Sequence, residues 1–299
     1  MDQHRHFRAF ATLSSAIAMI ACAPAFAQEA SISMDAIGKS SASLNDVSIV
    51  TMVEGNGEYS YKHSVSVAEK GEPQLRFDPS GGEASNTFLT AKIVEMDPAN
   101  DTPEVVTFNW TGGAHCCNAI TVATKTPSGW NTVDVGAFDG DQERHFPQDI
   151  DSDGRFEIRS VDNNFLYRFT SYAGSYAPPQ IWGVEGGKVV NRSADPAFRY
   201  AMDEWLETTK PPEGDDEWVG ESRNSYLAAR AAVMALKGEG EKGLAEAITR
   251  HDPKATGGLT ECPQKTSATG ECPVAEVTRP YGDVLREFLI SIGYAVPPQ

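Results

Sequence analysis

The spacing of hydrophobic and polar positions changes once along the chain, near Asp195. From about residue 46 up to this point, short segments rich in Val, Ile, Thr, Tyr and Phe recur, and several alternate apolar with polar residues. Alternation with a period of two is typical of strands that bury one face. We predict strands at 47–53, 61–67, 73–78, 89–96, 104–110, 119–125, 131–136, 156–161, 165–172, 179–185 and 188–193. Glycine pairs such as Gly186-Gly187 favour hairpin turns between them, so we expect an antiparallel β domain.

After Asp195 the apolar residues recur at spacings of three and four, which indicates amphipathic helices. Pro196 is suited to the first turn of a helix, and Gly238 and Gly293 lie where C-terminal capping glycines are common. We predict helices at 197–209, 221–238, 241–251 and 281–293. The expected fold is therefore mainly β, with a β-rich domain over residues 28–195 and a helical region over 196–299.

The first 27 residues have the features of an export signal. A cationic start is followed by an apolar run and then by Ala25-Phe26-Ala27, an A-x-A cleavage site. The apolar run is too short for a membrane span, and no later segment has 18 uninterrupted apolar residues. We expect a periplasmic or secreted protein without a membrane span. The alternative is a lipid anchor at Cys22, whose preceding residues loosely resemble a lipobox.

Charge and cysteine content narrow the function classes. A formal net charge of −17 repels phosphate backbones, which argues against nucleic-acid binding and favours cations as ligands. In an oxidising compartment cysteines form disulfides. Cys262 and Cys272 lie ten residues apart in a polar loop of the helical region, which makes them the simplest pair. The adjacent Cys116 and Cys117 remain to be explained.

The segment from Asp149 to Glu157 is the richest in candidate chemistry. Asp149, Asp151 and Asp153 occupy alternate positions and are followed by Gly154. Clustered carboxylates repel one another unless a cation lies between them, and Ca²⁺ takes about six to eight oxygen ligands from such a turn. The alternative is a solvated acidic turn held by local hydrogen bonds. An EF-hand is excluded because Ser160 occupies its twelfth position and a predicted strand follows.

The sequence DIDSDGRFEI, residues 149–158, resembles the FG-GAP and VCBS repeats of integrin-α-like β-propellers. In that family a D-x-D-x-D-G-x-x-D motif lies in a turn between blade strands. The resemblance implies a structural Ca²⁺ whose ligands are the side chains of Asp149, Asp151, Asp153 and Glu157 and the backbone carbonyl of Arg155. Glu157 stands where the family has its last Asp.

A weak internal repeat accompanies this resemblance. Glu104 and Glu157 are matching points 53 residues apart, a spacing that suits a four-stranded sheet used as a propeller-like blade. Two units are too few for a closed propeller, which typically has about 4–8 blades. The earlier unit keeps Asp97, Asn100 and Asp101 but lacks the glycine, so we expect it to hold no ion.

A second unusual segment contains His115, Cys116 and Cys117, and several roles are open for it. The two cysteines could form a vicinal disulfide, or each could pair with Cys262 or Cys272. His115 with both thiolates could instead form a copper, zinc or redox centre.

The leading functional prediction is a calcium-stabilised, non-enzymatic binding or interaction module for an unknown protein or glycan. One alternative is a hydrolase of envelope polymers that uses Asp139, Asp141 and Glu143. The other is a redox or metal protein centred on His115.

Overall fold

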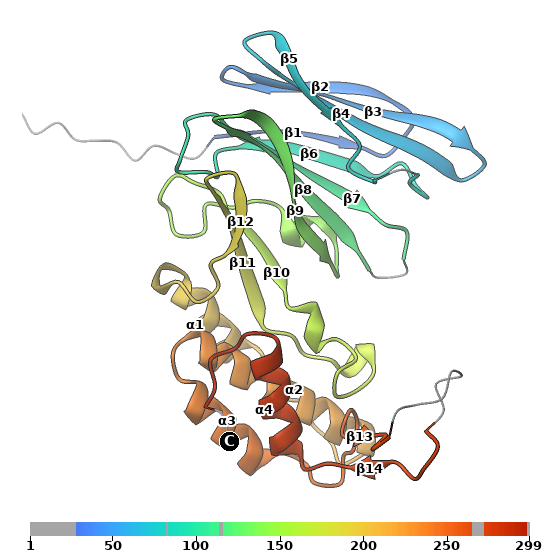
Figure 1. Ribbon diagram of the computed structural model, residues 1–299, viewed down its shortest axis with the longest axis vertical. Helices are drawn as coiled ribbons and strands as arrows, with labels where there is room; N and C mark the ends of the chain where they lie inside the picture. The colour runs from blue at the N-terminus through green and yellow to red at the C-terminus, as the bar shows by residue number, and fades with distance from the viewer. Residues whose placement is uncertain (1–27, 82, 114–115, 265–271, 298–299) are drawn as a thin grey trace, which may run out of the picture.

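The computed structural model describes residues 28–297 except 82, 114–115 and 265–271 (Figure 1). The predicted export signal and His115 therefore lie outside the described residues. Within them, antiparallel sheets are followed by a helical region, which confirms the predicted fold class. In Figure 1 the sheets and the helices occupy opposite ends of the long axis of the molecule.

Two meander sheets pack face to face at the N-terminal end. The outer sheet has the order β2 (Gly38–Leu44), β3 (Val47–Gly57), β4 (Ser60–Glu69) and β5 (Glu72–Phe77). The central sheet has the order β1 (Glu29–Met34), β6 (Leu89–Val94), β7 (Glu104–Trp110), β8 (Asn118–Thr126) and β9 (Gly129–Phe138). Strands β1 and β2 lie within the predicted β domain but before its first predicted strand. They were missed because their serine-rich sequences carry a weak apolar signal.

A third sheet covers the other face of the central one. It contains β10 (Ile158–Val161), β11 (Pro179–Glu185) and β12 (Lys188–Asn191). Val105 of β7 packs in one hydrophobic core with the outer sheet, whereas its neighbour Val106 packs in a second core with Ile158 and Val184. Because both faces of the central sheet are covered, β6 and β7 are almost continuously buried rather than alternating between buried and exposed.

The helical region contains α1 (Arg199–Thr208), α2 (Glu217–Leu236), α3 (Gly240–Arg250) and α4 (Tyr281–Ser291). Buried alanines of α2 allow close approach of the other helices. A short hairpin of β13 (Thr260–Glu261) and β14 (Val277–Thr278) precedes α4. The structure joins Cys262 to Cys272 beside this hairpin, with an S–S distance of 2.03 Å. None of the helices in the described part of the chain combines the length and the apolar content that a membrane crossing requires.

The predicted strand at 165–172 is wrong. The chain there forms two 3₁₀ turns, η2 (Asn163–Phe165) and η3 (Tyr172–Gly174). Phe165 and Phe169 are both fully buried among the helices, and Tyr167 between them has a φ of 61°, outside the strand region. The aromatic residues that suggested a strand belong to residues 162–178. This segment inserts into the core of the helical region, and we call it the wedge.

Candidate functional site

The acidic turn between Gln148 and Glu157 brings its three aspartates together. One carboxylate oxygen from each of Asp149, Asp151 and Asp153 lies within 4.8 Å of the others. Gln148 and Glu157 close the turn with two backbone hydrogen bonds of 2.8 and 2.9 Å. These are the spacings of a preformed cluster of oxygen ligands.

Two of these oxygens have no hydrogen-bond donor. Asp149 Oδ1 and Asp151 Oδ1 are buried and unpartnered. Asp149 Oδ2 accepts from Gly154 N at 3.1 Å, and Asp153 Oδ1 accepts from Arg155 N at 2.9 Å. Burial and the neighbouring carboxylate of Asp153 raise the pKa of Asp151. Unpaired buried oxygens are costly, so the turn fits a cation better than it fits its own backbone donors.

Glu157 lies beneath this cluster and is only 1% exposed. Its Oε2 accepts from Ile150 N at 3.2 Å, and its Oε1 accepts from Arg192 Nη1 at 3.3 Å. Burial raises the pKa of Glu157 to about 8, and the nearby Asp151 carboxylate contributes to the rise. The protein thus holds Glu157 with its own donors on both oxygens, while Asp149 and Asp151 each keep one oxygen unpaired.

In the earlier turn of the internal repeat, Glu104 and Asp97 are bonded by protein donors. Glu104 is fully buried, and its Oε2 accepts from Met96 N and Asp97 N at 2.8 and 3.1 Å, as Glu157 does from Ile150 N. Asp97, also fully buried, accepts from Ala99 N at 2.9 Å and holds the β11–β12 hairpin. Its carboxylate accepts hydrogen bonds from Gly186 N at 2.9 Å and from Gly187 N at 2.7 Å. These two carboxylates have donors on every oxygen.

Glu95, at the start of that earlier turn, should make stability fall as pH rises. Its Oε1 is buried without a partner, and burial, followed by the Glu104 carboxylate, raises its pKa from 4.5 to about 7. Between these two values the folded state binds more protons than the unfolded state, so raising the pH costs stability. Glu95→Gln should therefore stabilise the protein by about 1–2 kcal/mol near pH 8 and by almost nothing near pH 5. Urea denaturation in chelator at both pH values measures this, and an equal gain at both would contradict it.

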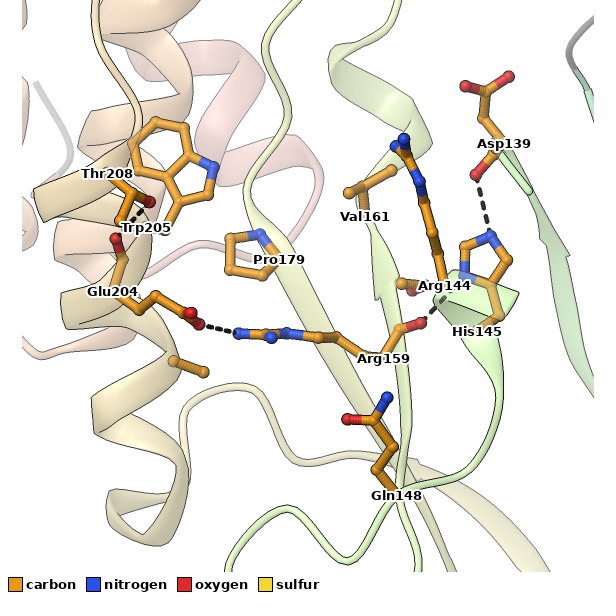
Figure 2. A pocket seen from close by; sticks show the side chains of 13 residues that line it. Asp139, Arg144, His145, Gln148, Arg159, Val161, Pro179, Glu204, Trp205 and Thr208 are labelled. Carbon is orange, nitrogen blue, oxygen red and sulfur yellow. Dashed lines mark hydrogen bonds and ion pairs between the residues drawn. The ribbon is translucent and has the colours of Figure 1, made fainter. Parts of the chain in front are cut away.

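A cavity of about 470 Å³ lies next to the acidic turn, between η1 (Gln142–His145), β10 and α1 (Figure 2). Gln148, which closes the turn, also lines this cavity. On the helical side Tyr200 Oη donates to the carbonyl of Ile150 at 3.0 Å, which joins α1 to the turn. The turn and the cavity therefore share a wall.

Charged groups from distant parts of the chain line this cavity. Arg159 Nη2 donates to Glu204 Oε2 at 2.8 Å across it, from β10 to α1. His145 is 2% exposed, and its ring nitrogens lie 2.9 Å from the carbonyl oxygens of Asp139 and Arg159. His145 thereby fixes the end of β9 to β10. Neither Arg159 nor Glu204 is marked by a local sequence pattern, because the two residues lie on elements far apart in the chain.

The acidic residues proposed for a hydrolase are not gathered in one place. Asp139 lines the cavity of Figure 2, and its carboxylate accepts a hydrogen bond from Tyr172 Oη. Asp141 and Glu143 line a different cavity, beside Phe88 and Trp110. Asp139 therefore lies apart from the other two acids, which share one cavity, and the hydrolase alternative stays a prediction.

The structure pairs Cys116 with Cys117. The alternative in which these cysteines bond to Cys262 or Cys272 is not the pairing that the structure has. Thr111 N donates to Cys117 O, and Cys117 N donates to Thr111 Oγ1, each at 2.9 Å, so the pair closes the loop after β7. The redox or metal role predicted for these cysteines with His115 stays a prediction.

Parts of this chain are similar in sequence to known proteins. Residues 198–293 match the family model of the sll0997 C-terminal domain. The chain is 36% identical over 216 residues to "Probable thylakoid lumen protein sll0997" of Synechocystis, an alignment that covers 72% of this chain and 63% of that protein. It is 28% identical over 258 residues to "Uncharacterized protein y4bJ" of Sinorhizobium fredii, covering 84% of this chain and 39% of that one.

The chain spans less than two thirds of the length of either of these relatives. No solved structure matches it. The family model begins at Phe198, where the β sheets give way to α1, and ends at Gly293, after α4. The part of the chain that forms the helical region is thus similar to the sll0997 C-terminal domain.

Proposed function

We propose that this chain is an exported, calcium-stabilised binding module in which the acidic turn holds a structural Ca²⁺. The observation that carries this proposal is the pair of buried, unpartnered oxygens, Asp149 Oδ1 and Asp151 Oδ1, within a cluster of three converging carboxylates. Asp149, Asp151 and Asp153 would supply side-chain oxygens and Arg155 its carbonyl. Glu157, already bonded to Ile150 N and Arg192, would act at most through one oxygen or a water molecule.

Comparison of the two repeat turns supports the choice of the second as the ion site. In the first turn every oxygen of Asp97 and Glu104 has a protein donor, and one oxygen, Glu95 Oε1, is buried without a partner. The second turn leaves two such oxygens, and they belong to converging aspartates. Hard oxygen ligands in a flexible loop suit Ca²⁺. The FG-GAP and VCBS resemblance of residues 149–158 points to the same ion, and the repeated arrangement of the turns is in keeping with it.

The ion would stabilise the junction between the sheets and the helices. Ile150 in the turn accepts from Tyr200 of α1, and Glu157 below it accepts from Arg192, which also bonds Asp195 at 3.1 Å before the first helical residues. Fixing the turn thereby fixes the position of α1 against β10. The adjoining cavity is the place where we propose that the module binds its ligand.

Three observations support an exported location, either periplasmic or secreted. The first 27 residues have the composition of an export signal, and the Cys262–Cys272 disulfide is typical of oxidising compartments. The relative from Synechocystis has a name that places it in the thylakoid lumen, which lies across a membrane from the site of synthesis.

Calcium should raise the melting temperature of the purified, chelator-treated protein. For affinities of about 10⁻⁴–10⁻³ M, as in extracellular calcium modules, about 10 mM Ca²⁺ adds about 1.4–2.7 kcal/mol to the free energy of unfolding. For a chain of this size that corresponds to a rise of about 3–10 °C in scanning calorimetry. Equal melting temperatures in calcium and in chelator would contradict the proposal.

Two variants separate a calcium site from general charge screening. Asp151→Asn should melt at or slightly above the wild-type temperature in chelator, because it removes a like charge, and should lose the response to calcium. Asp101→Asn changes an exposed residue of the earlier turn and should keep the full response. A response that Asp151→Asn retains would place the ion elsewhere.

A further inference from the structure

We propose that the cavity between η1, β10 and α1 binds a small organic anion, namely a carboxylate attached to an aromatic or aliphatic body. This assignment rests on the proposed binding role of the chain and names the ligand class that the cavity would take. It does not depend on the identity of the ion in the acidic turn. The assignment is argued from the guanidinium groups of Arg144 and Arg159 and from the apolar side chains that line the rest of the cavity.

Both guanidinium groups have donors to spare. Among the described residues, the only side chain that bonds Arg159 is Glu204, and it engages Nη2 alone. The guanidinium of Arg144 makes no hydrogen bond to any described residue, and it lies 4.0 Å from the exposed carboxylate of Asp141. Figure 2 shows both side chains on the β side of the cavity, with Arg159 reaching across it to Glu204 and Arg144, whose side chain is 75% exposed, running in a different direction. An arginine fork with free donors is suited to a carboxylate, which accepts two parallel hydrogen bonds.

Two arginines and two carboxylates, Asp139 and Glu204, line the cavity, so the charge that a ligand meets depends on where these side chains point. The formal net charge is −17, so an anion is repelled from most of the surface and needs a concave basic site to bind. The carboxylate of Asp139 does not compensate the arginines in the cavity, because it is turned away from His145 in Figure 2 and accepts from Tyr172 Oη. Glu204 is then the one carboxylate that opposes an anionic ligand from within the cavity.

The remaining wall is suited to an apolar body. Trp205, Pro179, Val161 and Ala201 line the cavity together. The Trp205 ring stacks on Tyr226, with centroids 5.9 Å apart and planes 14° from parallel, so its orientation is fixed before a ligand arrives. A volume of about 470 Å³ lies in the range of about 300–1,000 Å³ that small-molecule sites occupy. A ring or short alkyl chain against Trp205 would place its carboxylate toward the arginines.

The experiment compares 4-phenylbutyrate with its neutral amide by isothermal titration calorimetry on the calcium-saturated full chain. The anion should bind at least about tenfold more tightly than the amide, because only the anion can form the charged, bidentate contact. Raising the ionic strength should weaken binding of the anion and leave the amide unchanged.

Three variants test the assignment of the charges. Arg159→Gln and Arg144→Gln should each weaken anion binding about three- to tenfold, whereas Glu204→Gln should strengthen it by a similar factor, because it removes the opposing carboxylate. Arg76→Gln, an exposed arginine on β5 that bonds Ser64 at 3.2 Å, serves as the matched control and should change nothing. A merely structural role for Arg159 and Glu204 would make both substitutions weaken binding.

The proposal is overturned if the anion and the amide bind equally, if neither binds, or if Glu204→Gln weakens binding of the anion. If Arg159→Gln fails to fold, the amide comparison and Glu204→Gln still decide the outcome. The calcium test reads melting temperature in the absence of any organic ligand. Failure of the anion assignment is therefore distinguishable from failure of the calcium site.

Discussion

Replacing Asp97 with alanine is expected to lower the free energy of unfolding by about 3–5 kcal/mol. The carboxylate is fully buried and accepts from the backbone nitrogens of Ala99, Gly186 and Gly187, the last two in the β11–β12 hairpin. Alanine would leave three N–H groups without acceptors, two of them on a hairpin 89 and 90 residues away in the sequence. Denaturation in guanidinium chloride with linear extrapolation measures the loss.

The control for this experiment lies in the same turn. Asp101 is exposed, so Asp101→Ala should change the free energy of unfolding by no more than about 0.5 kcal/mol. If Asp97→Ala were as mild as Asp101→Ala, the carboxylate would not be what holds the hairpin against the central sheet. The repeat turn would then owe its shape to its prolines and backbone alone.

Phe165→Ala should be equally damaging, at about 3–5 kcal/mol. Phe165 is fully buried, and its ring makes edge-to-face contacts with Phe288 at 5.0 Å and Tyr294 at 5.9 Å between centroids. Truncation removes both aromatic contacts and leaves a cavity where the wedge meets α4. Chemical denaturation measures the loss, and protease cleavage within residues 162–178 should accelerate because the wedge then opens more often.

Tyr167 provides the matched comparison two residues along the wedge. Its side chain is 62% exposed, so Tyr167→Ala should cost well under about 1 kcal/mol and leave cleavage slow. A similar cost for both substitutions would mean that the aromatic character of the segment matters and not its insertion among the helices.

The strands that could be predicted are those whose local pattern matches their surroundings. In β4 the residues Val65 and Val67 are buried while Ser64 and Ser66 are partly exposed, which is the alternation that the sequence displays. Helices α3 and α4 follow a similar rule with helical spacing, because each buries one stripe, whereas α2 is buried around most of its surface. Gly238, with a φ of 82°, also ends α2 as expected of a capping glycine.

Segments 165–172 and 29–44 show where local pattern fails. Phe165 and Phe169 read as strand residues because aromatic residues favour strands, but tertiary packing among the helices decided their conformation. Strands β1 and β2 lie at sheet edges and contain many serines, so their pairing with β6 and β3 supplies the order that composition does not indicate.

The two parts of the candidate site differ in the same way. The acidic turn is encoded within nine consecutive residues, so its convergence could be predicted from spacing and Gly154 alone. The cavity requires Arg159 from β10 and Glu204 from α1 to meet across 45 positions. Such a pair becomes visible only when the sheets and helices are placed together.

The wedge also governs the order in which the chain can be completed. Synthesis runs from the N-terminus, so Phe165 and Phe169 leave the ribosome well before Phe288 and the rest of α4, which cover them. Until α4 has been synthesised, these aromatic rings lack the contacts that bury them and remain apolar surface on an incomplete chain. Burial of the wedge therefore has to wait until the last helix of the chain is available.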